Sequence, residues 1–194
     1  TSMQRLSSGL RVNSAKDDSA GLAIAERMNA QVRGMNVAIR NANDAISLAQ
    51  TAEGAIGKIS DMLQRMRELA VQSANATNSA DDRTNLNAEY GQLAAEITRT
   101  IGATKFNGQA ILGADAGAKV FQVGANSGET VTVTTTNLTA TFSAGDITSV
   151  TNANTALGAI DTAMTAFNSE RALYGAAQNR FESVIANLQV AAES

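Results

Sequence analysis

The chain has 194 residues and a formal net charge of -3, and it contains no cysteine, no histidine and no proline. The missing cysteine excludes disulfides and Cys-ligated metals, and the missing histidine removes the commonest general base and the commonest zinc ligand. A small acidic net charge gives no basic field for a phosphate backbone, and no run approaches the roughly 18 apolar residues of a membrane span. We therefore expect no cofactor, no nucleic acid and no membrane partner.

The first twenty residues are polar and predict a linker. Gly9 would interrupt a helix entering from upstream, and Ser14 with Asp17 three residues later resembles a capping box. The spacing predicts that the first helix begins between about residue 15 and residue 21.

An apolar heptad then recurs in steps of three and four residues. A period of 3.5 keeps one side of an α-helix facing a partner, which predicts a rod roughly 75 Å long that ends near residues 75–78. A compact enzyme seldom needs such a helix, whereas a fibre subunit does. This seam consists of Ile24, Met28, Gln31, Met35, Ala38, Ala42, Ala45, Ala49, Ala52, Ile56, Ile59, Leu63, Met66, Ala70 and Ser73.

Two further helices are expected. Ser79 with Asp82 is a second capping signal, and helical spacing continues to Gly102, which predicts a helix over about 79–102 antiparallel to the first. A second heptad from Leu157 to Leu188 predicts a helix over about 154–191.

The segment of about 105–150 has the texture of strands and turns. Asn107-Gly108 and the stretch Gly124–Gly128 are turn signals, and Val120–Val123 and Val131–Thr136 alternate as strands do. The predicted fold is mainly α: an elongated antiparallel bundle of coiled-coil-like helices with one or two β-hairpins. We expect residues 21–194 to form a single rod-shaped domain.

Three blocks of this sequence resemble bacterial flagellin. They are RLSSGLRVNSAKDDSAGLAIAERM at residues 5–28, LQRMRELAVQSANATNS at 63–79 and AQNRFESVIANLQ at 177–189. The resemblance covers nearly the whole chain in the family's order, and motifs of this length are highly specific.

The resemblance implies a structural subunit of the extracellular flagellar filament, which binds other flagellin subunits as a homopolymer and an export chaperone before assembly. It implies a fragment trimmed at both ends, lacking most of the terminal inner-tube helices and with little or no variable outer domain; such a fragment alone is expected not to assemble. Residues 1–20 would join the inner and outer tubes. Candidates for polar intersubunit contacts there are Arg5, Arg11, Lys16, Asp17 and Asp18, and the alternative is an ordinary solvated helix entry.

A second implication concerns host defence, because Toll-like receptor 5 of animal hosts reads a surface of flagellins on the 63–79 helix. When the motifs of this sequence are matched to those of flagellins, the receptor-binding candidates are Arg65, Leu69 and Glu89. Arg65 and Leu69 are four residues apart, so they share one side of a helix, where an exposed arginine and leucine would suit receptor binding. Alternatively, Arg65 pairs with Asp61 and Leu69 widens the core stripe.

Parts of this sequence also fit functions other than that of a filament subunit. A hook-associated filament junction protein shares the terminal blocks, and a receptor-binding module alone is an alternative of another class. The adjacent carboxylates Asp17-Asp18 and Asp81-Asp82 could suggest an enzyme, but adjacent helical residues point in different directions and both pairs suit helix N-termini. With no histidine, the His-Glu-x-x-His peptidase signature is impossible. We therefore expect no catalytic residue.

Overall fold

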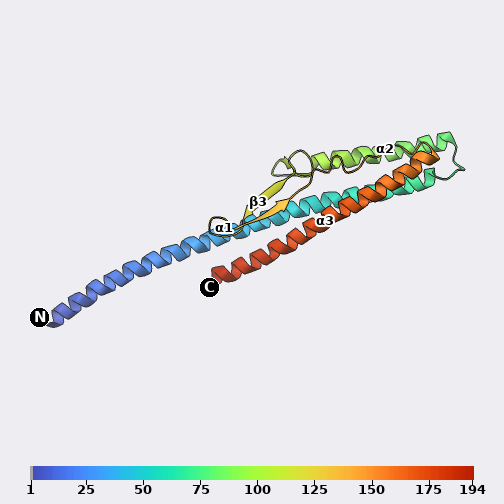
Figure 1. Cartoon of the computed structure of the whole chain (residues 1–194). Coiled ribbons are helices and arrows are strands. Elements are labelled where there is room, and N and C mark those ends of the chain that lie inside the picture. The colour runs from blue at the N-terminus through green and yellow to red at the C-terminus, as the bar shows by residue number, and fades with distance from the viewer. Residues whose placement is uncertain (1) are drawn as a thin grey trace.

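The computed structural model describes residues 2–194, with side chains described from residue 15 onward. Within that range an elongated helical bundle carries two small antiparallel hairpins, and α1 projects well beyond the end of α3 (Figure 1). The predicted mainly α fold is confirmed. The elements in chain order are α1 (Ser2–Ser73), α2 (Ala80–Ala103), β1 (Lys105–Phe106), β2 (Gln109–Ala110), β3 (Ala118–Gln122), β4 (Thr130–Thr134) and α3 (Val150–Glu193).

Helix α1 is longer than the sequence pattern predicted. It runs unbroken over 72 residues from Ser2, or about 110 Å at about 1.5 Å per residue. The predicted helix start between about residues 15 and 21 is wrong, so Ser14 and Asp17 do not cap a helix end. The physical reason is that a glycine inside a helix costs only about 1 kcal/mol, and Gly9 has no proline beside it to add a real break.

The heptad seam of α1 is buried along its C-terminal two thirds. Every seam position from Ala38 to Ser73 is at most 1% exposed. The N-terminal end of this buried stretch carries alanines, and its C-terminal end carries larger side chains, among them Ile56 and Leu63. Burial does not extend to Ile24 and Met28, which are 56% and 57% exposed, because α1 has passed the end of α3 there (Figure 1).

Helix α3 contributes the matching side of this core. Its buried side chains include Ile160, Phe167, Tyr174 and Phe181, one from each successive heptad. The helix begins at Val150 with Ser149 as its N-cap, whose side chain accepts a hydrogen bond from the Asn152 N–H. The helix therefore begins about one turn before the predicted start near residue 154.

The end of α1 and the start of α2 are closed by side chains. The predicted capping box is present, with Ser79 and Asp82 exchanging hydrogen bonds of 2.9 and 3.0 Å. Arg83 then reaches back across the turn and donates from Nε to the Ser73 carbonyl and from Nη2 to the Asn75 carbonyl, each at 2.9 Å. These bonds satisfy carbonyls that a helix end leaves without intrahelical partners.

Two hairpins form, where the sequence pattern predicted one or two. Asn107 and Gly108 join β1 to β2 with φ values of 49° and 76°, the pair of positive values that a type I′ turn requires. The larger hairpin, β3 with β4, lies over α1 and α3. There Phe121 meets Phe181 edge to face at 5.7 Å between ring centres, and Asn41 of α1 donates to the Gln122 carbonyl at 3.0 Å.

The segment before α3 is held by hydrogen bonds to two helices. The Tyr90 hydroxyl donates to the Ala144 carbonyl, and the Ile147 N–H donates to Asn87 Oδ1 at 3.0 Å. The Ser73 hydroxyl also donates to the Ile147 carbonyl, and the Ile147 side chain is fully buried. This connection therefore forms part of the core.

Candidate interaction surface

A bidentate ion pair joins α1 to α2 at the predicted receptor-binding candidates. Arg65 Nε and Nη2 donate to Glu89 Oε1 and Oε2 at 2.8 and 3.0 Å, and Arg65 Nη1 also contacts Glu68 at 3.1 Å. The hydrogen bonds to Glu89, and next those to Glu68, raise the pKa of the Arg65 guanidinium above its ordinary value. The structure thus brings Arg65 and Glu89 together, as the facing-helix placement required.

This pair is accessible. The side chains of Arg65 and Glu89 are 49% and 48% exposed. Ion pairs at such exposure add little to stability, because water screens them and two long side chains must be ordered. The pair is better suited to presenting fixed charges to a partner than to holding the helices together.

Leu69 does not share that surface. Its side chain is 1% exposed and belongs to the main hydrophobic core. The expectation of an exposed Leu69 beside Arg65 is wrong, and the alternative that Leu69 widens the core stripe is confirmed. The other half of that alternative is wrong, since Arg65 pairs with Glu68 and Glu89 in place of Asp61.

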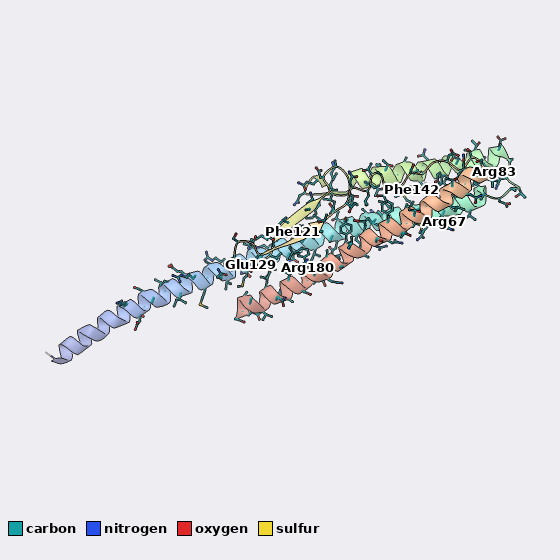
Figure 2. The ribbon with its side chains drawn as sticks, in the orientation of Figure 1. Arg67, Arg83, Phe121, Glu129, Phe142 and Arg180 are labelled. Atoms are coloured by element: carbon teal, nitrogen blue, oxygen red, sulfur yellow. The ribbon has the colours of Figure 1, made fainter. Side chains whose placement is uncertain are left out.

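A comparable ion pair on the other side of α1 was missed by the sequence reasoning. Arg67 Nε donates to Asp161 Oδ1 of α3 at 2.8 Å, and Figure 2 places Arg67 in the region where α1 and α3 run together. The contact raises the pKa of Arg67 and lowers that of Asp161. The two residues are 94 positions apart in the sequence. The only sequence signal was that Arg67 lies outside the heptad seam of α1.

The linker candidates lie on the projecting part of α1. Lys16, Asp17 and Asp18 are exposed, whereas the side chains of Arg5 and Arg11 lie outside the described residues. Exposed apolar side chains follow on the same stretch at Leu22, Ile24 and Met28. The projecting helix therefore combines charged and apolar side chains, as a contact surface does.

The remaining chemistry of the surface is sparse. Among residues 15–194, whose side chains the structure describes, no group of three or more acidic side chains is placed to hold a metal ion. In the same described range, no helix is both long enough and apolar enough to cross a membrane. Asp82 is engaged in the helix cap, and the hydrogen bonds with Ser79 lower its pKa.

An elongated bundle with a projecting helix and exposed fixed charges defines a structural building block. Sequence comparison gives its family. The family model described as "Bacterial flagellin N-terminal helical region" matches residues 1–116. Flagellin of Halalkalibacterium halodurans is 49% identical to this chain over 197 residues, which cover 99% of it. The chain belongs to the bacterial flagellin family, which supplies the structural subunits of the flagellar filament and is not a family of enzymes.

Other relatives differ in how much of their length they share. The chain spans 72% of the Halalkalibacterium flagellin, but only 37% of flagellin A of Vibrio cholerae, to which it is 54% identical over 140 residues. It spans 27% of the flagellin of Salmonella typhimurium, with 56% identity over 133 residues. The matched helical regions are thus shared with proteins that are considerably longer.

Solved structures agree with this assignment. The crystal structure of Bacillus cereus flagellin superposes with a TM-score of 0.72 at 36% identity, covering 77% of this chain and 88% of that one. A putative flagellar hook-associated protein of Vibrio parahaemolyticus gives a TM-score of 0.71 over 89% of this chain and 91% of its own, at 16% identity. The second likeness shows a shared fold alone, and the high sequence identities favour flagellin over the junction protein.

Proposed function

We propose that residues 21–194 form the outer-tube rod of an extracellular filament subunit and that residues 1–20 join it to the inner tube. Flagellins assemble as homopolymers, and a contact between different surfaces of identical subunits generates a helix when it does not close into a ring. The observation that carries the proposal is the projecting part of α1, where Ile24 and Met28, one turn apart, form an apolar stripe and are 56% and 57% exposed. Such a stripe on an otherwise packed helix favours burial against neighbouring protein.

Assembly can be tested by joining this chain to the terminal segments of the Halalkalibacterium flagellin and imaging the product by electron microscopy. We expect helical filaments from the native sequence and none from a variant carrying Ile24→Asp with Met28→Asp. A matched control, Glu26→Gln, changes charge on the opposite side of the same exposed stretch without touching the apolar stripe and should still polymerise. A soluble monomer from the native fusion would contradict the proposal.

Host recognition is a second proposed role, which rests on the geometry of Arg65 and Glu89. Toll-like receptor 5 is the proposed partner, and the half-exposed guanidinium held by two carboxylates offers it a charge in a fixed position. Arginine is enriched among the residues that dominate binding energy at interfaces. Leu69 would act indirectly, by packing beneath this surface.

The structure offers a matched control for this role. Arg65 and Arg67 are 49% and 44% exposed, and each forms an ion pair with another helix, but they point to different helices. In a pull-down with the receptor ectodomain, Arg65→Ala should weaken capture while Arg67→Ala should not. Equal capture of both variants and the native chain would remove Arg65 from the proposed site.

An export chaperone is a further proposed partner. Flagellins leave the cell through the flagellum's own channel, so a subunit must be kept from polymerising beforehand. The exposed apolar stripe of α1 is a candidate for such protection. Co-purification of the chain with a flagellar chaperone, lost on Ile24→Asp with Met28→Asp, would support this role.

A further inference from the structure

The outer edge of strand β4 carries backbone groups turned away from its partner strand. The Val123 N–H donates to the Glu129 carbonyl at 2.8 Å and the Thr135 N–H to the Gly117 carbonyl at 2.9 Å, which fixes the ladder at both ends. In an antiparallel pair, hydrogen-bonded and non-hydrogen-bonded positions alternate. The pairs of β3 with Thr132 and Thr134 are therefore non-hydrogen-bonded, and both threonines direct N–H and C=O outward.

The two edges of this hairpin are treated differently. On β3, the outward carbonyl of Gln122 accepts a hydrogen bond of 3.0 Å from Asn41 of α1. On β4, no backbone group of residues 2–194 and no side chain of residues 15–194 bonds the outward N–H or C=O of Thr132 or Thr134. An edge strand with unpaired backbone groups and no lysine or proline on it is a template for another strand.

A groove separates this edge from helix α3. It has a volume of about 310 Å³, with Val131 and Val133 of β4 on one side and Leu173, Ala177 and Arg180 of α3 on the other. Leu173 is 60% exposed, although it faces an apolar surface. A strand edge facing an apolar helix wall is the arrangement in which an extended peptide gains both main-chain hydrogen bonds and side-chain pockets.

Arg180 gives the groove a charge. Figure 2 shows it on the stretch of α3 that runs beside the hairpin, and its side chain forms no ion pair with any residue whose side chain the structure describes. Arg65, Arg67, Arg99 and Arg171, by contrast, each contact a carboxylate. A carboxylate on a bound segment would find an available guanidinium here.

We propose that this groove binds an extended acidic peptide segment of a partner protein, which adds a third strand to the β3–β4 sheet. The segment pairs with the outward N–H and C=O of Thr132 and Thr134. Alternate side chains enter the groove against Val133 and Leu173, and an aspartate or glutamate faces Arg180.

The shape of the site favours a single flexible strand over a second copy of this chain. Paired strands lie about 4.7 to 4.9 Å apart. A second rod entering through its own β4 would bring its own α3 against the first and place two Arg180 side chains in the same groove. A peptide segment carries no such wall and brings the opposite charge.

The test is an NMR titration of the ¹⁵N-labelled chain with the acetylated, amidated peptide of sequence TVEVTV. We expect the Thr132 and Thr134 amide signals to shift and saturate. Thr132→Pro removes an outward N–H that the ladder does not use, so it should weaken binding about tenfold, while Thr132→Val, which keeps the N–H, should bind as the native chain does. Far-UV circular dichroism checks that each variant is folded.

Arg180→Gln supplies an independent measurement that leaves β4 intact. It should weaken TVEVTV about fivefold and leave the weaker binding of the neutral peptide TVQVTV unchanged. Unmoved Thr132 and Thr134 signals, or equal binding by Thr132→Pro and Thr132→Val, would overturn the proposal. Concentration-dependent self-association that shifts the same signals without peptide would also overturn it, by assigning the edge to a second copy.

Discussion

The Arg65 guanidinium and the Glu89 carboxylate meet in parallel, with two hydrogen bonds of 2.8 and 3.0 Å between helices α1 and α2. This geometry fixes the direction of both side chains, which isolated surface charges would not achieve. Glu68, one turn along α1, holds the third donor of the guanidinium at 3.1 Å. The charge at this position is therefore ordered although it is exposed.

Charge reversal tests whether the pair orders the surface. Arg65→Glu places a third carboxylate beside Glu68 and Glu89, so we expect a lower thermal midpoint at low salt. The double variant Arg65→Glu with Glu89→Arg should recover most of the loss. Circular dichroism melts at about 1 M salt, where the screening length falls to about 3 Å, should show little difference among the three proteins. A defect of Arg65→Glu that salt does not relieve would point to packing in place of charge.

Truncating Leu69 should act on the fold. The side chain is 1% exposed within the main core, so Leu69→Ala should lower the free energy of unfolding by about 2 to 5 kcal/mol. Leu69→Met, which nearly conserves volume, should lower it by less than about 1.5 kcal/mol. Urea unfolding measures both. If Leu69→Ala were as stable as the native chain, the leucine would not be packed as the structure has it.

The sequence pattern located the seam of α1 well because burial follows a strict period. The seam positions from Ala38 to Ser73 are buried, and the period of 3.5 identifies each of these positions. The same pattern could not say where burial stops. Ile24 and Met28 continue the heptad yet are exposed, because burial depends on how far α3 reaches alongside α1, which is a property of the tertiary structure.

Side-chain partners were less accessible to prediction than helices. Arg67 and Asp161 are 94 positions apart, so their pairing depends on how α1 and α3 are rotated relative to each other. Local residue spacing does not determine that rotation. Local spacing also favoured Asp61 as the partner of Arg65, whereas the structure pairs Arg65 with Glu68 and with Glu89 of the second helix. Of the predicted receptor-binding candidates, Arg65 and Glu89 therefore lie on the surface, whereas Leu69 lies in the core.

The hairpin tip rests on α1 at a position where only glycine fits. A Cβ on Gly34 would lie 2.8 Å from the Cβ of Ala125, which is in the turn between β3 and β4. Beside this contact, Gln31 Nε2 donates to Asn126 Oδ1 at 3.0 Å. Gly34→Ala should push the turn away and break that amide pair. Hydrogen exchange should then become faster over residues 123–129.

Gly54 provides the control in the same helix. Nothing lies within 4 Å of a Cβ built on it, so Gly54→Ala should raise stability by about 0.5 to 1 kcal/mol through helix propensity alone. If Gly34→Ala were stabilising to the same degree and left exchange unchanged, the hairpin tip would not be in contact with α1.

Buried tyrosine should make the protein sensitive to alkali. Burial, and next the nearby charge of Asp146, raise the pKa of Tyr90 from 10.0 to about 12. A raised pKa means that the fold favours the neutral phenol, so this contribution to stability is complete below pH 10 and is lost as the pH rises towards about 12. At about 1.36 kcal/mol per pKa unit, the difference between 10.0 and about 12 corresponds to a loss of about 3 kcal/mol.

Tyr90→Phe separates this effect from general alkaline unfolding. Below pH 10 the variant should be less stable by about 1 kcal/mol, because it lacks the hydrogen bond to the Ala144 carbonyl. Above pH 10 its free energy of unfolding should fall less steeply than that of the native chain, so the two curves converge and then cross before pH 12. The pKa of Tyr174 is also raised by burial, and Tyr90→Phe with Tyr174→Phe should therefore be flatter still. Parallel curves for the native chain and Tyr90→Phe in urea melts from pH 8 to pH 12 would show that Tyr90 ionises equally readily in the folded and unfolded states.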